Sequence, residues 1–146
     1  MHASVVKPTL EFLNEQSFEG AEQEFLKAFE YRRKGDNKNA ISEASKSFES
    51  TMKTICDRRG FIYDAKNDTA KKLISILIDN NFLPAYLDSH LTGLRSTLES
   101  GLPTVRNRIG GHGQGTTIIN VSDELTEYAL HLAATNILLL AKLYKK

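Results

Sequence analysis

The sequence contains a single cysteine, Cys56, which excludes an internal disulfide and a structural zinc site built from several thiolates. A chain so poor in cysteine is typical of a reducing compartment, so we expect a cytoplasmic protein. Cys56 lies one helical turn from Met52 beside an apolar stripe, and this position favours a packed thiol over a nucleophile. The four histidines are scattered and lack clustered carboxylates, so the sequence predicts neither a metal ion nor another cofactor.

An excess of charge of one sign is also lacking. The chain carries 19 Lys and Arg against 18 Asp and Glu, a formal net charge of +1. Nothing in this overall balance indicates nucleic acid, so any basic binding site must be local.

The chain has no long hydrophobic run. The longest apolar stretch, residues 129–144, includes His131, Asn136 and Lys142. It is too short and too polar for a membrane span and indicates a buried helix instead. Residues 1–10 lack the apolar core of a signal peptide, so we expect no membrane partner.

Apolar residues recur at steps of three and four through most of the chain, which predicts amphipathic helices. Gly35 and Gly60 each follow a basic last turn and are typical of helix ends, and Ser122 precedes an acidic first turn. Strand signal is confined to the β-branched run at residues 116–121. Helices are predicted at residues 21–33, 37–59, about 68–80, 84 to about 100, and 122–146.

These elements predict an all-α fold, a single-domain antiparallel bundle of four to five helices with a Gly-rich loop between the last two. Residues 1–20 are weakly patterned and contain Pro8 and Gly20, so we expect an N-terminal arm or a short irregular helix there. The helical domain is then expected over residues 21–146.

The Gly-rich segment between residues 101 and 121 concentrates the local positive charge. It has no acidic residue, five glycines, two arginines, Arg106 and Arg108, and one histidine, His112. Arginine offers a planar fork of donors that suits a phosphate, and histidine exchanges a proton near neutral pH. Asn107 adds an amide that can orient a neighbouring group. Together these groups suit cleavage of a phosphodiester without a metal.

The spacing of these residues does not by itself exclude simpler interpretations of the segment. A Gly-rich loop between helices is often only a turn, and a lone histidine in it is often a surface or capping residue. A phosphate cradle of the nucleotide-binding type is disfavoured, because the segment lacks the Gly-Lys-Ser/Thr ending and follows no strand.

Residues 98–115, LESGLPTVRNRIGGHGQG, resemble the signature of the abortive-infection C-terminal (Abi-C) family within the HEPN superfamily. Residues 40–55, AISEASKSFESTMKTI, are similar to that family's helix in which a Glu and a Lys recur one turn apart. The resemblance extends from about residue 21 to residue 146.

The resemblance implies a helical, frequently dimeric domain of a kind that often acts as a metal-independent endoribonuclease in phage defence or as a toxin. The family's active motif is an Arg followed, after four to six residues, by a His; Arg106 and His112 match it with five residues between them. Asn107 matches the polar residue that commonly follows the Arg. The spacing of three from Arg108 to His112 falls outside the motif, so Arg106 is the expected catalytic arginine.

Further residues are expected to support or bind beside this motif. Glu49 matches the polar helix residue often found near it, and the i,i+4 order of Glu49 and Lys53 favours an ion pair. An equally good interpretation is that Glu49 and Lys53 form a solvated surface ion pair that contributes little to stability or function. Glycines next to His112 allow the backbone to approach a ligand closely. The expected supporting residues are Glu49, Lys53, Arg108, Gly111 and Gly113.

Two functions from different classes follow. The first is an endoribonuclease in which Arg106, Asn107 and His112 are catalytic and RNA is the substrate. The second is a non-catalytic dimeric HEPN module that binds RNA or a nucleotide, or regulates a partner. Under either hypothesis a homodimer is expected, with a regulatory partner domain or an antitoxin as a further partner.

Overall fold

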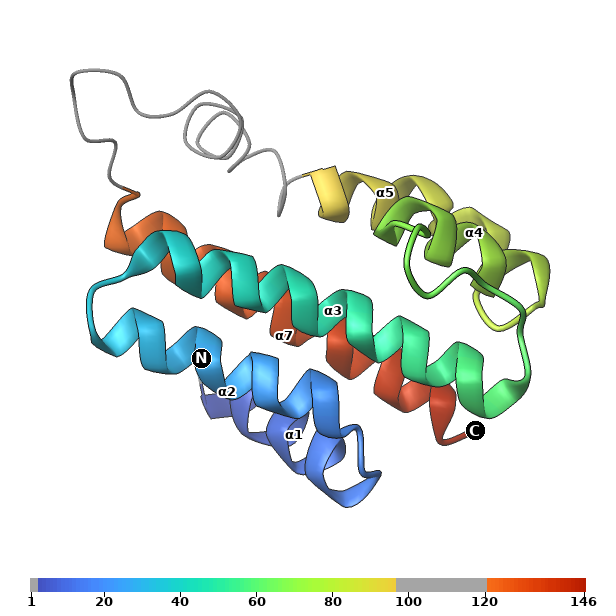
Figure 1. Cartoon of the computed structure of the whole chain (residues 1–146), viewed down its shortest axis with the longest axis horizontal. Helices are drawn as coiled ribbons and strands as arrows, with labels where there is room; N and C mark the ends of the chain where they lie inside the picture. The colour runs from blue at the N-terminus through green and yellow to red at the C-terminus, as the bar shows by residue number, and fades with distance from the viewer. Residues whose placement is uncertain (1–2, 97–120) are drawn as a thin grey trace.

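The structure is a computed structural model that describes residues 3–96 and 121–146. All of the regular structure in these two ranges is helical (Figure 1), which confirms the predicted all-α bundle. The helices are α1 (Ala3–Glu15), α2 (Glu19–Arg33), α3 (Asn37–Arg59), α4 (Ala70–Asp79), the short 3-10 helix η1 (Ala85–Leu87), α5 (Asp88–Ser96) and α7 (Asp123–Tyr144).

Helices α2 and α3 form an antiparallel hairpin whose turn follows local sequence. Gly35 has a φ of 80°, a backbone conformation that glycine adopts without steric cost. Asp36 then caps α3 by accepting a hydrogen bond from the backbone N–H of Asn39 at 3.3 Å. Farther along, the buried hydroxyl of Ser47 donates to the carbonyl of Ala21 at 2.7 Å, so the two helices are joined by a hydrogen bond as well as by apolar packing.

Residues 3–15, expected to form an arm or a short irregular helix, form the regular helix α1. Pro8 removes one helical hydrogen bond, yet tertiary contacts hold the helix in place. The buried hydroxyl of Thr9 shares its proton between the carbonyl of Val5 in its own helix, at 2.7 Å, and that of Ala134 in α7, at 3.0 Å, and Phe12 and Leu13 lie in the core. The predicted boundary between an N-terminal arm, residues 1–20, and a helical domain, residues 21–146, stays a prediction.

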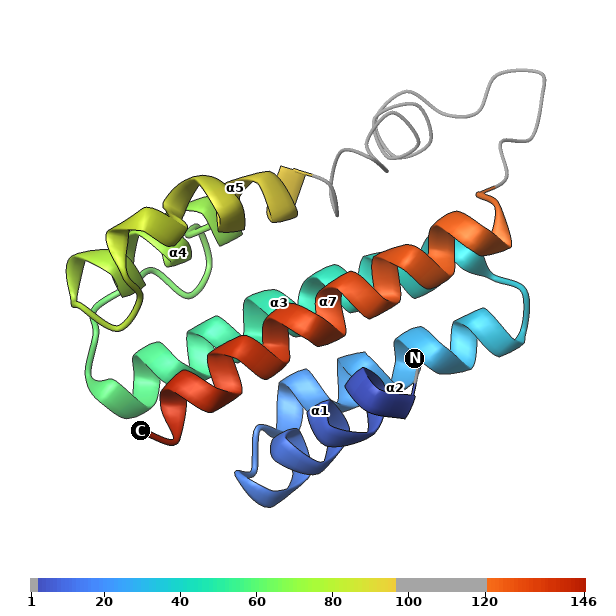
Figure 2. The same ribbon diagram turned by 180° about the vertical axis from the view of Figure 1, so that it is seen from behind.

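The centre of the bundle is a side-by-side pair, α3 and α7, that run in the same direction (Figures 1 and 2). Asn37 at the start of α3 contacts Val121 just before α7, and Arg59 at the end of α3 contacts Tyr144 at the end of α7. The expected antiparallel order therefore holds for α2 and α3, whereas α7 is parallel to α3. The chain between α3 and α7 carries the backbone back to the end where α3 began.

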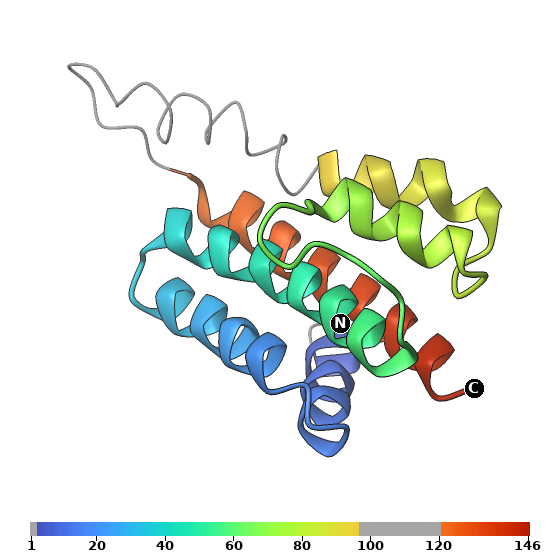
Figure 3. The same ribbon diagram turned by 45° about the vertical axis from the view of Figure 1, so that its right-hand side comes forward.

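The remaining helices cover this central pair from two sides. The α1–α2 hairpin lies along one side and the α4–α5 pair along the other (Figure 3). Pro84, expected to open a fourth regular helix, has an extended ψ of 142° and precedes η1, so the regular helix α5 begins only at Asp88. Within the described ranges, no helix is long and apolar enough to cross a membrane.

Two consecutive arginines at the end of α3 tie together the ends of other helices. The guanidinium of Arg58 donates to the carbonyls of Gln16 and Ser17 at 2.6 and 2.8 Å, and it lies 4.5 Å from the centre of the Phe18 ring. Arg59 donates to the carbonyl of Tyr144 at 2.7 Å. Carbonyl groups at or just after the end of a helix have no hydrogen-bond partner within that helix, and the two guanidinium groups supply the missing donors.

Replacing Arg58 with Ala should lower the free energy of unfolding by about 2 kcal/mol, because three hydrogen bonds and two cation–π contacts are lost. Chemical denaturation monitored by circular dichroism measures the change. Arg33→Ala is the matched control, since Arg33 is an exposed arginine at the end of α2. A loss for Arg58→Ala no larger than that of the control would contradict this role.

Candidate functional site

The segment that carries the predicted motif lies outside the described residues. Arg106, Asn107, Arg108, Gly111, His112 and Gly113 all fall within residues 97–120, so their predicted roles stay predictions. What the structure describes is where this segment is attached. The described chain leaves at Ser96 in α5 and resumes at Val121, nine residues after His112.

The downstream attachment is held by the first residue of α3. The side-chain amide of Asn37 donates to the carbonyl of Val121 and to Oδ1 of Asp123, both at 2.8 Å. Asn37 is only 8% exposed and its bond to Val121 is buried, whereas the Asp123 carboxylate is exposed to water. Ser122 caps α7, as predicted, by accepting from the backbone N–H of Leu125 at 3.1 Å. The first turn of α7 therefore has a defined position beside α3.

A second contact to the same turn comes from α2. The guanidinium of Arg32 lies 3.5 Å from Asp123 and 3.7 Å from Glu127. Arg32 is the second-last residue of α2. Its guanidinium pairs with two carboxylates that lie one turn apart on α7. The sequence of α2 alone does not predict this contact, because both partners belong to another helix.

Glu49 and Lys53 form the ion pair that their spacing predicts, with 3.4 Å between Oε1 and Nζ. Their side chains are 32% and 28% exposed, so the pair is neither fully solvated nor buried. The Lys53 ammonium also donates to the carbonyl of Ala65 at 3.1 Å, which fastens the α3–α4 connection to α3. This bond gives Lys53 a structural role that does not depend on the motif.

The surroundings of Glu49 are acidic. Burial raises the pKa of the Glu24 carboxyl on α2, a hydrogen bond with Ser50 opposes this rise, and the negative charges of Glu43 and Glu49 add to it. Lys46 partly offsets them by pairing with Glu43 at 2.9 Å. A phosphate placed here would meet these carboxylates as well as the ammonium groups of Lys46 and Lys53, and the role of Glu49 beside RNA stays a prediction.

The cysteine and the two histidines of the described ranges lie in different surroundings. Cys56 is fully buried, and burial raises the pKa of its thiol to about 11, with the charges of Asp57 and Asp68 contributing. The thiol is protonated at neutral pH, which confirms the prediction of a packed cysteine. His90 is exposed on α5 and His131 is half-buried on α7. Among residues 3–96 and 121–146, no group of three or more His, Cys, Asp or Glu could hold a metal ion.

Comparison with known families agrees with the resemblance carried by the motif. No curated protein and no solved structure matches the chain. The family model Abi_C, described as a HEPN-like domain, matches residues 19–144, which includes α2 to α7 and the whole motif segment. The chain therefore belongs to the Abi_C family of HEPN-like domains.

Proposed function

We propose that the chain is a metal-independent endoribonuclease whose catalytic residues are Arg106, Asn107 and His112. The observation that carries the proposal is the spacing of Arg106 and His112, with five residues between them, in a stretch of a HEPN-like chain that contains no acidic residue. The absence of carboxylates leaves the positive charge of the arginines available to a phosphate.

In the proposed reaction His112 accepts the proton of a ribose 2′-hydroxyl, and the 2′-oxygen attacks the adjacent phosphorus. The bond from phosphorus to the 5′-oxygen breaks, and this leaving oxygen takes up a proton. Arg106 stabilises the negative charge that develops on the phosphoryl oxygens, and Asn107 orients one of the reacting groups. The products are a cyclic phosphate and a 5′-hydroxyl end.

The dimer expected for this family has a candidate surface on α7. Tyr128 is 53% exposed, and Leu132 and Leu139 follow it at helical spacing and are only partly buried. Figure 2 shows this helix in front of the molecule, with no other described helix over it. We propose that a second copy of the chain packs on this face, which would bring two motif segments into one assembly.

Cleavage of RNA in the presence of EDTA should persist and should depend on the motif. His112→Ala is expected to lower the rate by about 10²–10⁴-fold, because proton transfer is lost. Arg106→Ala is expected to lower it by about 10²-fold or more, because charge stabilisation is lost. Arg108→Ala, at an expected binding residue, should lower the rate less than Arg106→Ala does, and Arg33→Ala, at an exposed arginine at the end of α2, is the control that should keep the native rate.

The same assay distinguishes the alternatives. DNA of the same sequence should resist, since it lacks the attacking hydroxyl. Equal cleavage by the native protein and His112→Ala, or cleavage of DNA, contradicts the mechanism. RNA binding without turnover under all conditions supports the non-catalytic module instead.

Asn37→Ala should lower the cleavage rate by about tenfold, because the start of α7, and with it the end of the motif segment, loses its attachment to α3. Asn39→Ala is the control, since Asn39 is exposed two residues away and, among the described residues, its side chain bonds Asp36 alone. Both rates are measured at a temperature where circular dichroism shows folded protein. An unchanged rate for Asn37→Ala would show that this attachment does not position the motif.

Tyr128→Glu should weaken self-association, because a charge replaces an aromatic ring on the proposed dimer face. Sedimentation equilibrium of the native and variant proteins measures the dissociation constants, and a rise of about tenfold or more is expected. Tyr86→Glu changes a tyrosine that is 81% exposed on η1 and should leave the constant unchanged. A native protein that stays monomeric, or a Tyr128→Glu protein that associates as the native one does, contradicts the proposed face.

A further inference from the structure

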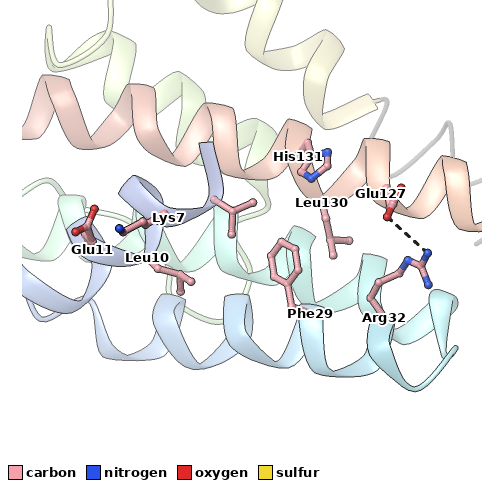
Figure 4. A pocket seen from close by; sticks show the side chains of 9 residues that line it. Lys7, Leu10, Glu11, Phe29, Arg32, Glu127, Leu130 and His131 are labelled. Carbon is pink, nitrogen blue, oxygen red and sulfur yellow. Dashed lines mark ion pairs between the residues drawn. The ribbon is translucent and has the colours of Figure 1, made fainter. Parts of the chain in front are cut away.

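A cavity of about 460 Å³ lies between α1, α2 and α7 (Figure 4). This volume is within the range of sites that hold small organic molecules. Its apolar lining comes from all three helices: Val6 and Leu10 from α1, Phe29 from α2, and Leu130 from α7. A ligand with a largely apolar body would therefore bury its surface against side chains that already face one another.

At one end of the cavity, Arg32 has unused hydrogen-bonding capacity. Its contacts to Asp123 and Glu127 are 3.5 and 3.7 Å long, beyond the roughly 2.9 Å of a good hydrogen bond. Its Nε–H is buried and has no acceptor among the described residues. A guanidinium carries five N–H donors, so an oxygen acceptor on a ligand would find a donor here.

The charges around the cavity decide what kind of acceptor fits. Arg32 faces two carboxylates on α7, and Lys7 and Glu11 lie together toward the other end in Figure 4. The fixed charges of these five side chains sum to −1, with His131 left out of the sum. An anionic ligand would be repelled by the carboxylates, and a cation would offer Arg32 no acceptor and compete with it for its partners. An uncharged acceptor, such as a ketone, amide or ester oxygen, satisfies Arg32 without either cost.

We propose that this cavity binds an uncharged, largely apolar small molecule that carries a hydrogen-bond acceptor. Such a molecule would pack between α1 and α2 and contact Arg32 through its acceptor. Because Arg32 also pairs with the first turns of α7, binding there stabilises the helix start to which the motif segment is attached. The α1 wall, residues 3–15, lies outside the range matched by the family model, whereas the α2 and α7 walls lie within it.

Fluorescence titration with prodan, an uncharged naphthalene dye with one ketone oxygen, tests the proposal on the full chain. The dye should bind with a blue-shifted emission, and anilinonaphthalene sulfonate, an anion of similar size, should bind at least about tenfold more weakly. Val6→Trp fills the cavity and should lower the prodan affinity by about tenfold or more. Lys7→Trp, on the exposed edge of the same wall, should also lower the prodan affinity. It replaces Val6→Trp in the test if that variant does not fold.

Two matched comparisons separate this site from unspecific dye binding. Leu138→Trp fills the neighbouring groove between α1 and α7 and should leave the prodan affinity unchanged. Arg32→Lys keeps the charge but removes the fork of donors, and should weaken prodan by about tenfold while leaving N-phenylnaphthylamine, which has no oxygen acceptor, unaffected. Tighter binding of the anionic dye, equal effects of Val6→Trp and Leu138→Trp, or no effect of Arg32→Lys on prodan would overturn the proposal.

Discussion

The side-chain amide of Asn37 joins the start of α3 to the start of α7, and the arrangement around the motif segment depends on this contact. It donates to a buried backbone carbonyl and to an exposed carboxylate, both at 2.8 Å. Breaking the bond to Val121 would leave a buried carbonyl unpaired, at a cost of about 1–3 kcal/mol. The start of α7 is therefore not free to slide along α3.

Because the starts of α3 and α7 are joined, the two helices run parallel and the rest of the bundle follows from that pair. Their far ends are closed by Arg59, which donates to the carbonyl of Tyr144. The α1–α2 hairpin then covers one side, with Thr9 bonded to α7 and Ser47 to α2. Polar contacts of this kind fix the relative position of helices along their axes, whereas apolar packing alone tolerates small shifts.

Much of this fold is predictable from sequence, since its helix ends depend on local chemistry. Gly35, Gly60 and Ser122 act at helix ends as their residue types indicate. Helix α1 could not be predicted with the same ease, because Pro8 argues against a helix and the compensating bond, from Thr9 to Ala134, joins residues 125 positions apart. The parallel direction of α7 was likewise hard to predict, because it depends on contacts of Asn37. Asparagine is common at helix starts, so its presence there does not indicate a contact with another helix.

The candidate site likewise contains residues that local sequence predicts and residues whose roles depend on tertiary contacts. The motif residues were found because their types and spacing are local, and the resemblance they carry agrees with the family to which the chain belongs. Arg32 and Asn37 escaped prediction because their roles exist only once α2, α3 and α7 are packed together. Glu49 and Lys53 form the expected ion pair, and the role of Glu49 beside the motif stays a prediction.

The chemical nature of the cut ends tests the central claim most directly. Attack by the 2′-hydroxyl leaves a cyclic phosphate on one product and a hydroxyl on the 5′ end of the other. Mass spectrometry of a short RNA treated with the native protein in EDTA should find this pair of ends, and His112→Ala should produce neither. Products with a 5′-phosphate would show attack by water and would contradict the account.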